Sequence, residues 1–266
     1  EGTEEYAVMP LRNTVLFPQQ VIPIYIGREK SLKLISDLEL ENRKYIIVVA
    51  QEDGSIEDPS TEDLYSYGTL ATVLKVFAMP DNSKSAIVQG IARVKILDYL
   101  EKEPYFKAAA SKVSDEPVAD QLELDDIVDN LRTSFSDLIK VAPNLTEEHT
   151  GMLSNIKKPN RLVDRAISLM TLPNQEKQEI LEEVNIKNRI DKAVSIINRE
   201  IQRIKLGEEI QTEVHDEIAK TQREYYLREQ MKAIQKELGE DEGTLELKEL
   251  EDRIKSAKMP KESEAV

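Results

Sequence analysis

Residues 185–239 read NIKNRIDKAVSIINREIQRIKLGEEIQTEVHDEIAKTQREYYLREQMKAIQKELG. No proline interrupts this stretch, and Gly207 is the one glycine inside it before the final Gly239. Such a sequence predicts one helix of about 50 residues, which is about 75 Å long at 1.5 Å per residue. Helices of soluble proteins average about 11–12 residues. We therefore expect this helix to leave a domain and to carry or contact something at a distance.

The apolar residues of this helix change phase near Gly207. Before it they follow at spacings of 4, 3, 4 and 3, which is typical of a single apolar seam: Ile190, Val194, Ile197, Ile201 and Ile204. Beyond it the stripe is thin and lies among Glu, Lys, Arg and Gln: Ile210, Val214, Ile218, Tyr225, Met231, Ile234 and Leu238. We expect the first part to complete a helical bundle and the second part to project from it.

The composition of the chain limits the classes of function that it can have. The chain has 266 residues and a formal net charge of −15, which argues against nucleic acid or an anionic membrane as its partner. It contains no cysteine, so it has no disulfide or thiolate site, and this suits a reducing, cytoplasmic location. No apolar run approaches the length of a membrane span, and the N-terminus does not resemble a signal peptide.

The first part of the chain alternates with the period of a strand. We expect strands at residues 6–11, 21–26, 45–50, 69–78, 85–97 and 105–113, and one helix at about 28–40. Short strands at this spacing favour a compact, mixed and partly closed sheet. Gly90 inside a strand predicts a bulge or a close backbone approach. Arg93 is expected to point outward, in solvent or in an ion pair.

Residues 10–23, PLRNTVLFPQQVIP, contain three prolines and therefore form a loop or a sheet edge in large part. The stretch nevertheless carries several apolar side chains. They either fill the end of the sheet or form an exposed apolar lip that holds unfolded polypeptide.

A linker at residues 115–117 separates this part from helices with a period of 3.6. Three or four short helices precede the long one, and its isoleucine seam is the partner that their apolar stripes need. After Gly239, residues 247–257 predict a further helix that folds back as a hairpin. The chain lacks a starting Met and ends just after Pro260, which we interpret as a sign of a trimmed fragment.

The patterns of several enzyme classes are missing. The sequence has no P-loop, no G-x-G-x-x-G and no G-x-S-x-G. His149 and His215 are far apart, and neither has a second His or Cys at ligand spacing, which makes a metal site improbable. We assign no catalytic, cofactor-binding or metal-binding residue.

Three stretches in order, PLRNTVLFPQQVIPIYIGREKS at 10–31, VVAQ at 48–51 and DLYSYGT at 63–69, resemble the N-terminal region of the Lon ATP-dependent proteases. QREYYLREQMKAIQKELGE at 222–240 and AKMPK at 257–261 resemble the segment that joins that region to the ATPase module of bacterial Lon. The resemblance implies an α+β chain with a PUA-like β domain (1–116), a helical bundle (117–206) and a projecting helix with a coiled-coil hairpin (207–266). It also implies that ATP, Mg²⁺ and the Ser–Lys dyad belong to modules absent here.

The resemblance further implies recognition of unfolded, damaged or degron-bearing proteins and support of hexamer assembly and gating. Met and aromatic side chains adapt to many partners, so the candidate substrate-binding residues are apolar: Leu16, Phe17, Val21, Ile22, Tyr225, Tyr226 and Met231. Two alternatives remain open. One is a purely structural oligomerisation arm, and the other is an RNA-binding module, which rests on fold analogy alone.

Overall fold

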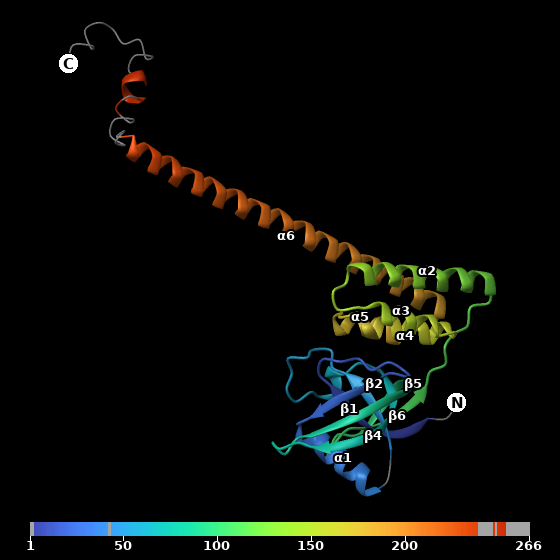
Figure 1. The fold of residues 1–266 in the computed structure, drawn as a ribbon. Helices are drawn as coiled ribbons and strands as arrows, with labels where there is room; N and C mark the ends of the chain where they lie inside the picture. The colour runs from blue at the N-terminus through green and yellow to red at the C-terminus, as the bar shows by residue number, and fades with distance from the viewer. Residues whose placement is uncertain (1–2, 42–43, 239–246, 248, 254–266) are drawn as a thin grey trace, which may run out of the picture. The chain divides into compact units, whose positions relative to one another are not determined.

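The protein is described from a computed structural model of residues 1–266. The described residues are 3–41, 44–238, 247 and 249–253. The chain divides into two compact units, residues 1–204 and 205–266. The first unit contains a β-sheet and a group of helices, and the long helix α6 (Ile186–Glu237) runs from the first unit into the second (Figure 1).

Six strands in the described part of the chain form one mixed sheet. They are β1 (Glu4–Leu11), β2 (Val21–Ile26), β3 (Tyr45–Ala50), β4 (Tyr67–Ala78), β5 (Lys84–Glu101) and β6 (Lys107–Lys112). Their order in the sheet is β2-β5-β4-β3-β1-β6. β1 and β3 are parallel, whereas the other pairs are antiparallel.

The 18-residue strand β5 closes the sheet. Its first half pairs with β2, its second half pairs with β6, and β6 also pairs with β1. Register shifts along the β4–β5 pair allow this long strand to bend. β2 pairs with β5 alone among the described strands and is therefore an edge. Helix α1 (Glu29–Glu41) packs Leu34, Ile35 and Leu38 into the core of the sheet.

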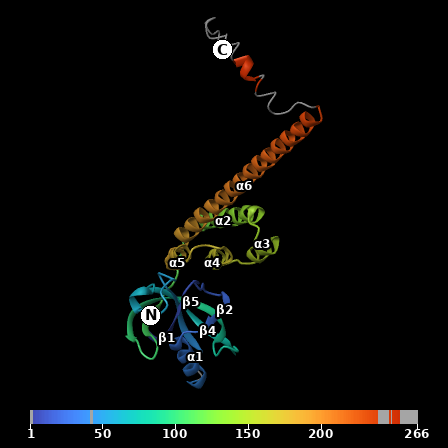
Figure 2. The same ribbon diagram turned by 90° about the vertical axis from the view of Figure 1, so that its left-hand side faces the viewer.

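Four shorter helices lie between the sheet and α6. They are α2 (Gln121–Val141), α3 (Glu147–Ser154), α4 (Pro159–Leu169) and α5 (Asn174–Glu182). The Asp120 carboxylate caps α2 by accepting the Leu122 N–H at 2.9 Å. Pro159 occupies the first turn of α4, where a missing N–H costs nothing. In both views of the first unit, α4 and α5 lie over one end of the sheet (Figures 1 and 2).

Helix α6 (Ile186–Glu237) is 52 residues long, which confirms the expected long helix. Its first part buries the predicted isoleucine seam in the bundle, including Ile190, Ile197 and Ile201. The last apolar residue of α6 that packs against this core is Ile204. From Ile210 onward the apolar side chains of the helix are half or more exposed. The phase change in the sequence therefore marks the end of burial along α6.

The sheet and the bundle share one core. The largest buried cluster joins residues of α2, α4, α5 and α6 with Val15, Phe17 and Ala50 from the sheet part of the chain. Two further clusters lie within the sheet itself. The bundle therefore covers apolar side chains of the sheet part that would otherwise be exposed to solvent.

The expected strands and α1 are found, with ends that differ by up to four residues. The Gly90 prediction is confirmed, because a Cβ atom there would lie 2.2 Å from the Phe17 carbonyl oxygen. Of the two alternatives for Arg93, the ion pair is confirmed and the position in solvent is wrong: the side chain is 4% exposed and paired with Asp164, because the bundle covers it. Of the helix predicted at 247–257, residues 247 and 249–253 are described and are helical, and the remaining ones lie outside the described residues. In the described part of the chain, no helix is both long and apolar enough to cross a membrane.

Candidate functional site

Residues 13–20, here called the strap, lie along β5 and are tied to the sheet. The Thr69 hydroxyl donates to the Leu16 carbonyl at 2.5 Å. The Gln19 N–H donates to the Gly90 carbonyl at 2.9 Å. Because residue 90 carries no side chain, the two backbones can approach this closely. The strap is therefore a fixed wall of the first unit.

Side chains of the strap alternate between two cores. Val15 and Phe17 enter the bundle core, and Leu16 enters the sheet core. Val21, which follows the strap at the start of β2, is 50% exposed. Ile22 is partly buried against the sheet core. The exposed apolar lip considered from the sequence is thus confined to Val21 and its neighbours, because Leu16 and Phe17 fill cores.

The opposite wall comes from the turn after α3 and the first turns of α4. Arg132 of α2 fixes this turn, since its guanidinium donates to the Leu153 carbonyl at 2.8 Å and to the Ile156 carbonyl at 2.7 Å. Hydrogen bonds from a charged donor to buried carbonyls are among the stronger ones. The wall is therefore held by the Arg132 side chain, which does not itself line the space between the walls.

A groove of about 620 Å³ lies between the two walls, here called the strap groove. Its lining is partly apolar, through Pro18, Val21 and Ile156, and partly basic. The basic rim consists of Lys157, Lys158, Arg161 and Arg165. No hydrogen bond or ion pair is found for the charged groups of the rim within the described residues. The groove thus offers apolar surface beside uncompensated positive charge.

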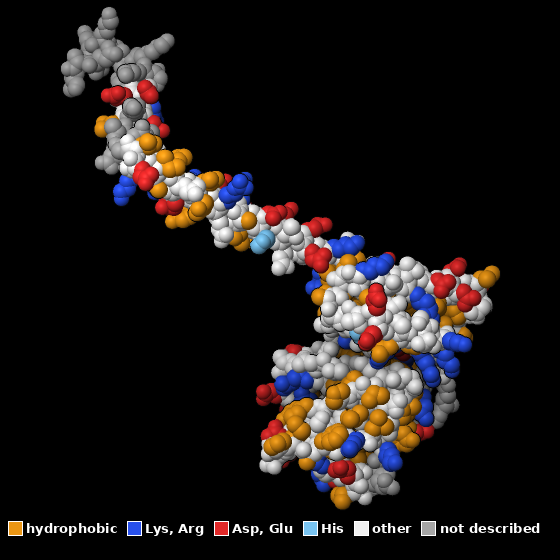
Figure 3. Space-filling view, viewed as in Figure 1, with side chains coloured by type: hydrophobic (Ala, Val, Ile, Leu, Met, Phe, Trp, Pro, Cys, Tyr) orange, Lys and Arg blue, Asp and Glu red, His pale blue; other side chains and the backbone are white. Residues whose placement is uncertain are grey.

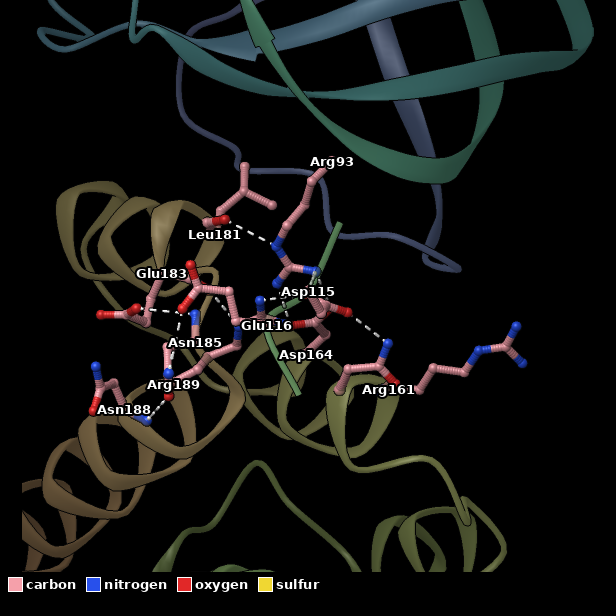
Figure 4. A network of polar contacts seen from close by, with 11 residues as sticks. Arg93, Asp115, Glu116, Arg161, Asp164, Leu181, Glu183, Asn185, Asn188 and Arg189 are labelled. Carbon is pink, nitrogen blue, oxygen red and sulfur yellow. Dashed lines mark hydrogen bonds and ion pairs between the residues drawn. The ribbon is translucent and has the colours of Figure 1, made fainter. Parts of the chain in front are cut away.

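Asp164 of the groove lining belongs to a buried ion-pair network (Figure 4). Arg93 of β5 donates through both terminal nitrogens to Asp164 of α4, at 2.8 and 2.5 Å. Arg189 of α6 donates to Asp115 at 2.5 Å, and its Nη1 lies 3.7 Å from Asp164. Both arginines are almost fully buried. The network joins β5, α4, α6 and the segment after β6 into one body.

Burial and hydrogen bonding shift the pKa values of Asp164 and Asp115 in opposite directions. Burial raises the pKa of Asp164, and the contact with Arg93 opposes that rise. Partial burial would also raise the pKa of Asp115, but hydrogen bonds from Asn160 and Arg189 outweigh it and lower that pKa. Backbone bonds add to the network: the Glu116 N–H donates to the Val184 carbonyl at 2.9 Å. The predicted linker is therefore docked against the start of α6.

A comparison with protein families shows to which family the chain belongs. Residues 5–199 match the family model described as "ATP-dependent protease La (LON) substrate-binding domain". The chain belongs to the Lon substrate-binding domain family. The match covers the sheet, helices α1–α5 and the first part of α6, so it includes both walls of the strap groove.

Curated relatives agree with the family. The chain is 39% identical over 261 residues to a Lon protease of Dictyoglomus thermophilum, across 98% of this chain and 33% of the relative. It is 40% identical over 255 residues to a Lon protease of Koribacter versatilis, across 95% of this chain and 31% of the relative. The chain thus spans about a third of the length of the curated Lon proteases that it matches.

A solved structure shares the fold. The N-terminal domain of a Mycobacterium avium complex Lon protease superposes with a TM-score of 0.60 at 18% sequence identity. The superposition covers 73% of this chain and 98% of that one. This confirms an α+β architecture, with a mixed sheet followed by helices, for the Lon N-terminal region.

The residues expected from the sequence fall into two groups. Of those near the strap, Phe17 and Val21 line the strap groove, whereas Leu16 and Ile22 do not. Tyr225, Tyr226 and Met231 lie on α6 in the second unit and are 60–68% exposed. Whether any of them contacts a substrate stays a prediction.

On α6 itself, Tyr225 lines a shallow groove with Val214 and Ile218. Both apolar neighbours are about half exposed, at 51% and 52%. This stripe follows one face of the helix at spacings of 4 and 7. It is a second apolar surface, separate from the strap groove.

The sequence patterns predicted an ion pair for Arg93 as one of two alternatives, but neither its partners nor the basic rim. Two signals point to them. Asp164 lies within the buried stripe of α4, where an unpaired carboxylate would be costly. Arg161 and Arg165 are four residues apart and so share one face of α4. Among the described residues, no group of three or more His, Cys, Asp or Glu is arranged to hold a metal ion.

Proposed function

We propose that this chain holds unfolded, damaged or degron-bearing protein segments in the strap groove and passes them to the ATPase and protease modules of a longer Lon protein. The role is binding rather than catalysis, and ATP and Mg²⁺ are needed only by those modules. We place this activity in the cytoplasm, as expected from the absence of cysteine.

The observation that carries the proposal is the pairing of a fixed groove with exposed apolar surface in a substrate-binding family. The strap and the α3–α4 turn are both anchored by hydrogen bonds, so the groove exists before a ligand arrives. A preformed site loses less free energy to ordering on binding than a mobile one. Val21, 50% exposed at its mouth, gives an apolar side chain of a substrate a place to pack.

Substrate segments bind here through side chains rather than by adding a strand. β2 is the free edge beside the groove, but it contains Pro23 at its centre. Proline has no N–H to donate, so it interrupts the row of donors that an added strand would need. The side-chain surface of the groove is the remaining place for an extended segment.

The test is binding of a fluorescent, permanently unfolded protein, measured by anisotropy. Val21→Ser removes apolar surface from the mouth of the groove and should weaken binding by about five- to tenfold, from about 0.8 kcal/mol per CH₂ group. Leu40→Ser is the matched control, because Leu40 is 83% exposed on α1 and does not line the groove. Equal binding by both variants and the wild type would remove the groove from the proposal.

We also propose that the apolar stripe of α6 in the second unit contacts other Lon subunits and supports hexamer assembly and gating. Large apolar side chains are exposed on this part of α6 (Figure 3), and Val214, Ile218 and Tyr225 share one face of the helix, which favours association. Sedimentation of this chain over a range of concentrations tests the proposal. Self-association that Ile218→Ser weakens supports it, and a monomer at all concentrations contradicts it.

A further inference from the structure

The strap groove carries a charge opposite to that of the chain. The whole chain has a net charge of −15. In the groove, the basic rim contributes four cationic side chains, and the one acidic residue in the described lining is Asp164. That carboxylate is already engaged by Arg93 at 2.5 Å and faces Arg189 at 3.7 Å. The positive charge of the rim is therefore not neutralised from within the groove.

The rim is presented from a fixed frame. Arg132 pins the turn that carries Lys157. Arg161 and Arg165 lie one turn apart on α4. In Figure 4 the Arg161 side chain extends away from the buried network, so its guanidinium is available to a ligand. The positive end of the α4 dipole adds to the attraction of anions beside Lys158, which occupies the N-cap position of the helix.

We infer that the strap groove selects protein segments in which carboxylates stand next to apolar side chains. This inference rests on the proposed function, because it names the class of segment held in the same groove. Apolar side chains of the segment pack beside Val21 and Pro18, while its carboxylates meet the basic rim. Segments rich in Lys or Arg are repelled from the same place.

The spacing of the two arginines on α4 defines how the carboxylates of a bound segment should be spaced. Side chains four apart on a helix have Cβ atoms about 5–6 Å apart. Alternate residues of an extended chain are about 6.5–7 Å apart and point to the same side. Arg161 and Arg165 therefore match two carboxylates at alternate positions, Asp-X-Asp, of an extended segment.

A peptide ligand fits this groove better than a nucleic acid. A phosphate backbone needs an extended basic face, and the part of the chain that carries the sheet and the strap has more acidic than basic residues: 19 against 13 in residues 1–117. The rim is short and shares the groove with apolar residues, which offer nothing to phosphates. A single-stranded oligonucleotide is therefore included in the test as a competitor.

The test compares three labelled peptides of equal length and apolar content on the full chain. One carries Asp-X-Asp, the second carries Asn-X-Asn, and the third carries Lys-X-Lys. The two carboxylates of the acidic peptide can each form an exposed ion pair with the rim, which should make this peptide bind about tenfold more tightly than the neutral one. The difference should shrink as NaCl rises from about 50 to 500 mM, because salt screens exposed charges.

Charge reversal gives the decisive variant. Lys157→Glu combined with Arg161→Glu should abolish the preference for the acidic peptide, with neutral binding retained, because the rim then carries two cationic and two anionic side chains. Both positions are exposed, so folding should be kept, and an unchanged melting temperature checks this. Lys102→Glu is the control, since Lys102 is exposed and does not line the groove.

The outcomes separate the two proposals. Equal affinity for the three peptides, or a preference that survives charge reversal, overturns the acidic selectivity but leaves substrate binding standing. Binding of none of them overturns both. Tighter binding of the oligonucleotide, with displacement of the acidic peptide, replaces the peptide by nucleic acid as the ligand of the groove.

Discussion

The Asp164 carboxylate accepts hydrogen bonds from both terminal nitrogens of Arg93, at 2.8 and 2.5 Å, across the junction between the sheet and the bundle. Each of these side chains is 4% exposed. Asp164 also lines the strap groove. The geometry of the groove therefore depends on a contact between residues 71 positions apart in the chain.

Asp164→Ala should destabilise the chain by about 3–5 kcal/mol, because it leaves the buried charge of Arg93 without a partner. Urea unfolding followed by circular dichroism measures the loss. Lys102→Ala, at an exposed site, should change stability by less than about 0.5 kcal/mol. A loss below about 1 kcal/mol at Asp164 would show that the ion pair does not hold the junction.

Two glycines form a matched pair for a second prediction. Gly90→Ala should destabilise the first unit, since its Cβ would lie 2.2 Å from the Phe17 carbonyl oxygen and would push the strap off β5. Gly151→Ala in α3 should be neutral or stabilise by about 0.5–1 kcal/mol, because nothing lies within 4 Å of its Cβ and alanine favours the helix. A melting temperature of Gly90→Ala at or above that of the wild type would contradict the close approach at Gly90.

Asp115 gives the network a pH dependence. Its pKa in the folded chain lies below the ordinary value of 3.8 because Asn160 and Arg189 donate to it. A carboxyl with a lowered pKa adds stability that is present above its unfolded pKa and is lost as the pH falls through its folded pKa. Asp115→Asn should therefore destabilise the chain at pH 7, and its difference from the wild type should narrow below about pH 4. A difference that stays constant from pH 7 to pH 3 would show that the charge of Asp115 contributes nothing.

Phe17 should behave as a core residue. Its side chain is 1% exposed in the bundle core, so Phe17→Ala should cost about 3–5 kcal/mol of stability. Phe17→Leu, which retains most of the apolar volume, should cost less. Chemical unfolding of the two variants measures this order. If Phe17→Ala keeps full stability and only binding falls, then Phe17 acts as an exposed substrate contact instead.

Local patterns predicted the sheet and the helices well because each pattern is decided by neighbours along the chain. The strand at residues 21–26 and the long helix were found from period and from turn residues alone. Arg93 shows where this fails. Alternation correctly turns its side chain away from the core of the sheet, but only the fold reveals that the bundle covers that face and brings Asp164 to it.

The candidate site was predictable only in part, for the same reason. Residues 10–23 were recognised as a loop with apolar side chains, but the sequence does not show which of them face the bundle. Phe17 is buried by helices more than 100 residues later in the chain, and Val21 is left half exposed. The basic rim likewise becomes a site only when the α3–α4 turn lies opposite the strap.

The most direct test of the central claim is photo-cross-linking of the chain to a labelled unfolded protein. A photoreactive residue is placed at Val21 or Arg161 in the groove, and at Leu40 or Lys102 as exposed positions outside it. The strap groove predicts strong cross-links at the first two positions, which excess unlabelled unfolded protein abolishes and a folded protein does not. Equal yields at all four positions would contradict substrate binding in the groove.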